Sequence, residues 1–199
     1  MTKERPDVLA KPWKTDANYQ AYVQIQAEKT ARKRNNMARR IRSLAILLTQ
    51  KDGRLTNDLD ILSIGSRNTF ELDELRLAGY RSVTGIDLLS MHPEILPMDM
   101  HAMTFPDKSF DALFSCHNLE HAYDLDVCLR EWARVTRPGG TWAIELPVRY
   151  ETCGTDRQDV GGKQGLLYTL YPYIGEILFC EESSANSPAV VRFVGRTKR

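Results

Sequence analysis

The feature that most constrains this chain is an alternation, beginning near Leu59, between short apolar runs and segments of helix length. The runs typical of buried strands are DILSIG, SVTGID, EILPMD, FDALFSC and TWAIELPV, and the helical segments include FELDELRLAGY and DVCLREWARV. Strands that alternate with helices are joined by right-handed crossovers, which produce a mainly parallel sheet covered on both faces. The sequence therefore predicts a doubly wound α/β fold.

The C-terminal part of the chain follows a different pattern. After Pro147 comes a polar loop over residues 149–163, rich in Gly and Asp, and then the apolar segment GLLYTLYPYI. Two further strand candidates, EILFCEE and AVVRFVG, are separated by SSANSP, whose residue types favour turns. We therefore predict an antiparallel hairpin at one edge of the sheet.

The N-terminal quarter of the chain is basic, whereas the remainder is acidic. Residues 1–54 carry 13 Lys and Arg against 5 Asp and Glu, a net charge of +8, and the remaining residues carry 14 against 21, a net charge of −7. The formal charge of the whole chain is +1, which excludes a uniformly basic nucleic-acid coat and an acidic solvating tail. We divide the chain into a basic helical extension, residues 1–54, that packs on the core, and a main domain, residues 55–199.

A helix is predicted between Tyr19 and Gln50, where helix breakers are few. Its apolar residues recur at offsets that place them on one face, and they are Met37, Ile41, Leu44, Ala45 and Leu48. Four arginines lie largely opposite that face: Arg32, Arg39, Arg40 and Arg42. We favour a solvated charged face on a packed helix over a site for phosphate or nucleic acid. Gly53 is expected to follow the end of the helix.

Apolar runs and cysteine spacing narrow the class of protein further. The longest strongly apolar run, Leu44 to Leu48, is far shorter than the roughly 20 residues that cross a bilayer, so no membrane span is expected. The first residues, MTKERPDVLAKPW, lack the apolar stretch of a secretory signal, which predicts a cytoplasmic location. The four cysteines form no C-x-x-C pair, and we expect free thiols rather than a structural zinc site.

Ligands of open α/β sheets bind beyond the carboxyl ends of the strands. The first predicted strand ends at Ile64 and Gly65, and a glycine turn followed by a helix N-terminus lets the backbone approach a ligand closely. Asp87 ends the second strand 22 residues after Gly65. This is close to the ~20-residue spacing at which an acidic residue accepts hydrogen bonds from a ribose. The alternative role for Asp87 is a cap on the next element.

Three motifs, taken in order, resemble one family. They are FPDKSFD at residues 105–111, LEH at residues 119–121 and RVTRPGG at residues 134–140. Together with ILSIGSRNTFELDELRLAGYRSVTGIDLLS, they make residues 59–147 resemble the class I S-adenosylmethionine-dependent methyltransferases, in particular methyltransferase domain type 11. The resemblance implies a Rossmann-like fold and an enzyme that transfers a methyl group from S-adenosylmethionine. A nicotinamide-dependent dehydrogenase would not be expected to carry this combination.

The same resemblance assigns cofactor contacts to nine residues. Ile64, Gly65 and Ser66 would contact the methionine part, and Asp87 and Leu88 the ribose. Asp99 and Met100 would contact the adenine, and Ser115 and Cys116 would lie next to the sulfonium. A carboxylate acceptor and a polarizable thioether suit the edge and the face of a purine. By the same resemblance, His117 directly follows the fourth strand beside the acceptor, where it is the candidate catalytic base.

The glycine loop departs from the family pattern D-x-G-x-G-x-G. The acidic position and the three glycine positions are occupied by Ser63, Gly65, Arg67 and Thr69. Arg67 brings a positive charge near a cofactor that is itself a sulfonium cation, unless its side chain turns outward or contacts the cofactor carboxylate.

Three functions stay open at this point. The favoured one is a methyltransferase with a small-molecule acceptor. The second is a methyltransferase acting on nucleic acid or a phosphate-bearing substrate recruited by the arginines, with nucleic acid the less favoured partner. The third is a non-catalytic S-adenosylmethionine-binding relative that keeps the fold as a binding or assembly module because its glycine loop has decayed. The sequence does not identify the acceptor or an oligomeric state.

Residues 117–121, HNLEH, also match the H-x-x-E-H motif of zinc proteases. That motif needs both histidines on one face of a helix and a further ligand, whereas this run begins at the end of a predicted strand. We therefore expect no metal, and we place His121 as a structural residue near the start of the next helix. Asp159, in the polar loop, is a second candidate base beside His117.

Overall fold

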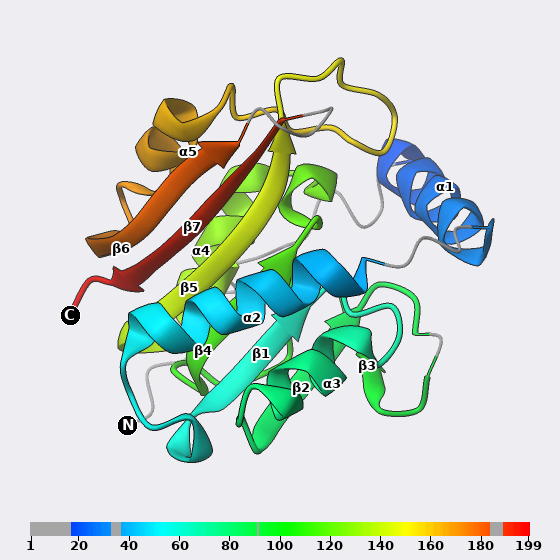
Figure 1. The fold of residues 1–199 in the computed structure, drawn as a ribbon. Helices are drawn as coiled ribbons and strands as arrows, with labels where there is room; N and C mark the ends of the chain where they lie inside the picture. The colour runs from blue at the N-terminus through cyan, green and yellow to red at the C-terminus, as the bar shows by residue number, and fades with distance from the viewer. Residues whose placement is uncertain (1–16, 33–36, 91, 184–188) are drawn as a thin grey trace, which may run out of the picture.

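Seven strands form one sheet in the order β3-β2-β1-β4-β5-β7-β6 (Figure 1). A computed structural model describes residues 17–32, 37–90, 92–183 and 189–199, with the side chains of residue 27 and residues 29–32 outside the description. The strands are β1 (Asp60–Ile64), β2 (Ser82–Asp87), β3 (Ile95–Pro97), β4 (Phe110–Cys116), β5 (Thr136–Val148), β6 (Ile174–Ser183) and β7 (Ala189–Thr197).

The pairing of the strands confirms the predicted fold class. Strands β3, β2, β1, β4 and β5 are mutually parallel, and β7 runs antiparallel to both β5 and β6. The doubly wound, mainly parallel, Rossmann-like sheet and the antiparallel C-terminal hairpin at its edge are therefore both present. Residues 184–188, which belong to the predicted turn of that hairpin, lie outside the described part of the chain.

Helices cover both faces of the sheet. In chain order the α-helices are α1 (Ala17–Arg32), α2 (Ala38–Asp52), α3 (Phe70–Leu77), α4 (Leu125–Val135) and α5 (Lys163–Leu170). Successive side chains of a strand point to opposite faces, so Ile61 of β1 packs in the core with α2 and α3, and Leu62 packs with α4 and α5. Figure 1 shows α2 and α3 across the near face, with α4 behind the sheet.

The basic extension forms two helices rather than one. The sequence predicts a single helix from Tyr19 to Gln50, but α2 begins at Ala38, and Met37 before it has non-helical backbone angles. Residues 33–36 lie outside the described ranges. Figure 1 shows that α2 lies along the sheet while α1 lies apart from it, near the carboxyl ends of the strands. The two helices therefore have different roles, although the boundary between residues 54 and 55 stays a prediction.

Helix α2 docks through the predicted apolar face. Its buried apolar side chains are Ile41, Leu44, Ala45 and Leu48, and all four belong to the core beside α3. Gly53 follows the helix with a φ of 69°, a left-handed conformation that glycine adopts readily. The predicted C-terminal stop of the helix is thus present.

Two of the four arginines are held by carboxylates of the main domain. Arg42 donates from Nε and Nη2 to the two oxygens of Glu74, both at 2.8 Å, and Arg40 donates from Nη1 to Glu145 at 3.2 Å. Arg39 is exposed, and the side chain of Arg32 lies outside the described part. Arg40 therefore departs from the predicted solvated face, because its length lets it reach the end of β5.

The strand register brings the carboxyl ends of four strands to one edge of the sheet. Ile64 pairs with Ile86 and with Ser115, Asp87 pairs with Pro97, and Cys116 pairs with Glu145. The loops that follow β1, β2, β3 and β4 therefore converge.

Among the described residues, no helix combines the length and apolar character that a membrane span requires.

Candidate functional site

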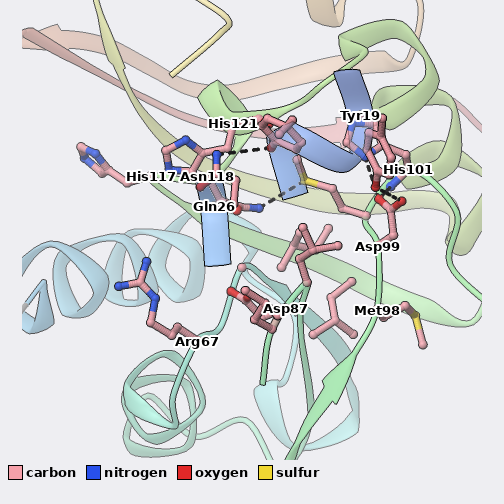
Figure 2. A pocket seen from close by; sticks show the side chains of 17 residues that line it. Tyr19, Gln26, Arg67, Asp87, Met98, Asp99, His101, His117, Asn118 and His121 are labelled. Carbon is pink, nitrogen blue, oxygen red and sulfur yellow. Dashed lines mark hydrogen bonds and ion pairs between the residues drawn. The ribbon is translucent and has the colours of Figure 1, made fainter. Parts of the chain in front are cut away.

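A cavity of about 670 Å³, including the space at its open mouth, lies beyond the carboxyl ends of the parallel strands. Loop residues after β1, β2, β3 and β4 form one wall, and Tyr19, Tyr22 and Gln26 of α1 form the other. Figure 2 shows Arg67 and His117 toward one end of this first cavity, Asp99 and His101 toward the other, and Asp87 between them. This is the position where doubly wound folds bind ligands.

The turn after β1 requires glycine at residue 65. Gly65 has a φ of 80°, and its N–H donates to the Ile86 carbonyl at 2.8 Å. A Cβ atom built on Gly65 would lie 2.4 Å from the side chain of Asn118. The absence of that atom leaves room for the β1 loop and the β4 loop to meet at the cavity floor.

Asp87 lies in the middle of the cavity wall, at the end of β2. Its Oδ1 accepts from the Leu89 N–H at 2.9 Å, which fixes the carboxylate toward the cavity floor. Burial raises the pKa of Asp87, while the Leu89 hydrogen bond and the charge of Arg67 oppose the increase. A ligand hydroxyl that donates to this carboxylate would stabilise its charged form.

Asp99 forms the far end of the cavity with His101 and Tyr19. Its Oδ1 accepts from the His101 backbone N–H at 2.9 Å and lies 2.7 Å from His101 Nδ1, and its Oδ2 accepts from the Tyr19 hydroxyl at 2.5 Å. His101 Nε2 accepts from the Tyr123 N–H at 3.0 Å, so Nδ1 carries the proton and donates. Burial alone would raise the pKa of Asp99, but the hydrogen bonds of His101 and Tyr19 lower it to about 2.

Helix α1 is fixed over the first cavity by aromatic and polar contacts. The Tyr22 hydroxyl donates to the backbone carbonyl of His121, and Gln26 donates to the Thr155 carbonyl at 3.1 Å. The rings of Tyr19 and Tyr123 meet edge to face with centroids 5.2 Å apart. The loop over residues 149–162 and helix α1 therefore close the same side of the site.

A second cavity, of about 980 Å³ including open space, adjoins the first. Four residues line both: Gly65, Arg67, His117 and His121. The remaining lining residues of the second cavity are Met37, Ile41, Asn68, Phe70, Glu71, Cys116, Glu120, Pro147 and Asp156. The two spaces thus meet at the loops that follow β1 and β4.

His117 stands at the junction in a strained conformation. Its φ is 55°, a left-handed value that is uncommon for a residue other than glycine. Its Nε2 lies 3.0 Å from Glu145 Oε1 and 3.0 Å from Arg40 Nη1, and its Nδ1 lies 3.7 Å from Glu120 Oε1. Glu145 is fully buried and also accepts from Arg192 Nε at 2.5 Å. The buried ion pairs therefore fix the imidazole between the two cavities.

The carboxyl group of Glu71 makes stability depend on pH. Burial raises its pKa from an ordinary value of 4.5 to about 7, and the nearby charge of Asp87 adds to the increase. Because the folded state holds this proton more tightly than the unfolded state, stability is lost as the pH rises from 4.5 through 7. Glu71→Gln is expected to match the wild type near pH 5 and to exceed its free energy of unfolding by about 1–3 kcal/mol near pH 8.

Chemical denaturation at the two pH values measures this difference. Glu151→Gln, at an exposed loop position that lines neither cavity, is the matched control and should show no such increase. Equal stability differences at both pH values for Glu71→Gln would contradict the burial of this carboxyl group.

Eight of the ten residues implied by the resemblance line one or both cavities. The first cavity is lined by Ile64, Gly65, Asp87, Leu88, Asp99, Met100 and His117. Cys116 lines only the second cavity, and burial raises the pKa of its thiol. Ser66 and Ser115 line neither and are fully buried. The Ser66 hydroxyl donates to Ser63 Oγ at 2.7 Å, and the alternation of β4 turns Ser115 into the interior.

Two secondary assignments from the sequence need correction. His121 belongs to a 3₁₀-helix, η3 (Leu119–His121), whereas α4 begins only at Leu125 with Asp124 as its cap. His121 therefore lines both cavities instead of starting α4. Asp159 accepts from the backbone N–H groups of Arg149 and Gly161 at 3.0 and 2.9 Å and lines neither cavity, so it organises its own loop. Within the described ranges, no three metal-ligating side chains are grouped to hold a metal ion.

Sequence reasoning missed several residues that line the two cavities. They are Tyr19, Tyr22, Gln26, Glu71, His101, Asn118 and Glu120. The position of His101 two residues after Asp99 is a signal that was present in the sequence, because a histidine there reaches back to the carboxylate. The α1 residues carry no comparable signal, since their partners lie far away in the chain.

Comparison with known proteins agrees with this geometry. Residues 62–144 match the family model described as a methyltransferase domain. A malonyl-[acyl-carrier protein] O-methyltransferase of Halorhodospira halophila is 46% identical over 48 residues, which are 24% of this chain and 16% of that protein. A sterol 24-C-methyltransferase of Neurospora crassa is 37% identical over 73 residues, 37% of this chain and 18% of that protein. The match thus spans less than a fifth of either relative.

Solved structures match over a larger share of the chain. The 1,6-didemethyltoxoflavin-N1-methyltransferase of Burkholderia thailandensis, solved with its substrate and S-adenosylhomocysteine, has a TM-score of 0.75 at 15% identity, covering 98% of this chain and 93% of that one. The [4+2]-cyclase SpnF has a TM-score of 0.65 at 16% identity, covering 79% and 80%. These likenesses show the fold, which hosts more than one reaction. Residues 62–144, with the motifs that they contain, therefore match a methyltransferase domain, and the solved structures show the same fold over most of the chain.

Proposed function

We propose that the protein is an enzyme that transfers a methyl group from S-adenosylmethionine to a small-molecule acceptor. The single observation that carries this proposal is the first cavity, where Gly65, Asp87 and Asp99 follow three successive strand ends and open onto a second cavity. The order of these residues matches the methionine, ribose and adenine parts of the cofactor. The names of the sterol 24-C-methyltransferase and of the toxoflavin enzyme support a small-molecule acceptor.

The residues of the first cavity fit the cofactor. Gly65 leaves the space that a side chain would fill beside Asn118, Asp87 offers a carboxylate to the ribose hydroxyls, and Asp99 offers one to the adenine edge. Met100 lines the same end, where its thioether can pack against the face of a ring. When bound, S-adenosylmethionine supplies an activated methyl group on its sulfonium.

We assign the methyl transfer to the junction between the two cavities. In-line displacement requires the nucleophile, the methyl carbon and the sulfur to be aligned, and holding two molecules in that order removes much of the barrier. The first cavity holds one reactant and the second cavity the other, so they meet at Gly65 and His117. His117 is the group we assign to accept the acceptor's proton, through Nδ1, because Nε2 is engaged by Glu145 and Arg40.

Cofactor binding is tested by titrating the protein with S-adenosylhomocysteine in a calorimeter. Asp87→Ala is expected to weaken binding by about 1–3 kcal/mol, because hydrogen bonds to a charged acceptor are lost. Asp58→Ala removes an exposed carboxylate that lines neither cavity and is expected to leave affinity unchanged.

Two outcomes would count against this proposal. An absence of heat and of a thermal shift for the wild-type protein at millimolar S-adenosylhomocysteine would refute cofactor binding. A larger loss for Asp58→Ala than for Asp87→Ala would place the ribose elsewhere.

A further inference from the structure

The second cavity has an acidic lining that the proposed function does not yet use. Its ionisable side chains include three carboxyl groups, on Glu71, Glu120 and Asp156, together with Arg67, His117 and His121. Glu71 comes from α3, Glu120 from η3 and Asp156 from the loop over residues 149–162. Three separate parts of the chain thus bring carboxyl groups to one space beside the methyl-transfer position.

Glu120 is the most deeply placed of these groups. Its residue is 3% exposed, and its Oε2 has no hydrogen-bond partner among the described residues. Its Oε1 lies 3.7 Å from His117 Nδ1. A buried carboxyl oxygen without a partner costs free energy in the protein alone, so this position is suited to a ligand that donates a hydrogen bond.

The backbone fixes Glu120 in this position. Its carbonyl accepts from the N–H groups of Arg157 and Gln158 at 2.9 and 3.0 Å, which joins η3 to the loop that covers the site. The side chain therefore does not depend on its own hydrogen bonds for its placement. An exchange of the carboxylate for an amide of the same shape is expected to keep the fold.

We propose that Glu120 anchors the methyl acceptor in the second cavity, and that the acceptor is a nitrogenous small molecule that presents N–H groups, neutral or cationic, to this carboxyl group. This inference rests on the proposed function and adds the chemical class of its substrate. Amidine, guanidine and ring N–H groups match a carboxylate in geometry and charge. Glu120 then determines specificity, while His117 remains beside the reacting atom.

Anionic acceptors fit this lining poorly. A phosphate or carboxylate placed near Glu120 would also face Glu71 and Asp156. Among the basic groups of the lining, His121 is already paired with Asp156 at 3.1 Å. Like charges in a partly buried space disfavour each other strongly. The lining therefore argues against the phosphate-bearing substrates that the basic extension suggests.

The inference is tested with three probes of one shape, namely benzamidine, benzamide and benzoate. Each is titrated into protein saturated with S-adenosylhomocysteine, and binding is followed by the backbone amide signals of residues 116–121 in NMR spectra. Benzamidine is expected to bind about tenfold more tightly than benzamide. Benzoate is expected to cause no shift in these signals.

Variants then assign the effect to one side chain. Glu120→Gln is expected to reduce benzamidine affinity about tenfold, to the level of benzamide, while S-adenosylhomocysteine affinity stays unchanged. Glu151→Gln is the matched control and is expected to alter neither affinity. The comparison of the three probes on the wild-type protein needs no variant and holds even if Glu120→Gln folds poorly.

Several results would overturn the inference. They are benzoate binding as tightly as benzamidine, no benzamidine shift at residues 116–121 at millimolar concentrations, and loss of benzamidine binding in Glu71→Gln but not in Glu120→Gln. Each of these results is measured on protein that binds S-adenosylhomocysteine, so none of them contradicts the proposed function. A failure of S-adenosylhomocysteine to bind would instead refute the proposed function itself.

Discussion

Leu44→Asp is expected to lower the free energy of unfolding by about 3–5 kcal/mol. Leu44 is fully buried in the seam between α2 and the sheet, in one cluster with Ile61, Phe114 and Val194. The variant removes an apolar side chain and places an unpaired carboxylate among apolar groups. Burial of an unpaired charge is among the few mechanisms that destabilise a protein this strongly.

The same helix provides a matched control for this prediction. Ile46 lies two residues further along α2 and is 47% exposed, so Ile46→Asp introduces the same charge at the surface. We expect a change of about 0.5 kcal/mol or less, as for most surface substitutions. Urea denaturation of both variants measures the contrast.

An unchanged free energy of unfolding in Leu44→Asp would overturn the packing assignment. If replacement of Arg39 and Arg40 by Ala also abolished binding to RNA, α2 would be a nucleic-acid-binding helix. Because Arg40 forms an ion pair with Glu145, we expect Arg40→Ala to disturb the position of His117 rather than the binding of RNA.

His117→Ala is expected to lower turnover by about 10²–10⁴ with an acceptor that the wild-type protein methylates. His117 lines both cavities, and its ring is fixed by Glu145 and Arg40 at the junction where the two reactants meet. The variant removes the group assigned to accept the proton, so the loss should appear in kcat. Asp87 and Asp99 are unchanged, and cofactor affinity should therefore be nearly unaffected.

A second histidine separates catalysis from folding in this experiment. The side chain of His92 is 41% exposed and lines neither cavity, so His92→Ala should retain full turnover. Transfer of labelled methyl groups and the melting temperature are measured on both variants. If His117→Ala turns over normally, the enzyme works by alignment of the two molecules alone, and the assignment of the base is wrong.

The sequence was sufficient to predict the sheet and the edge of the sheet where the candidate site lies. Apolar periodicity is a local property, and it identified β1, β2 and β4 together with the docking face of α2. Parallel strands place their carboxyl ends on one edge of a sheet, so Gly65, Asp87 and His117 were predictable as neighbours even though they are far apart in the chain. The family motifs added Asp99 and Met100 to the same edge.

Tertiary structure decided which helix covers this edge and which side chains line the second cavity. The hydrogen bond from Tyr19 to Asp99 joins residues 80 positions apart, and the bond from Arg40 to Glu145 joins residues 105 apart. The placement of Glu71 and Glu120 in one cavity likewise depends on where α3 and η3 lie in the folded chain. Such contacts follow from how whole elements pack, which leaves no periodic signal in the local sequence. The sequence by itself therefore determined the sheet and the strand ends at which we propose that the cofactor binds. The position of α1 and the lining of the second cavity were decided only by the tertiary structure.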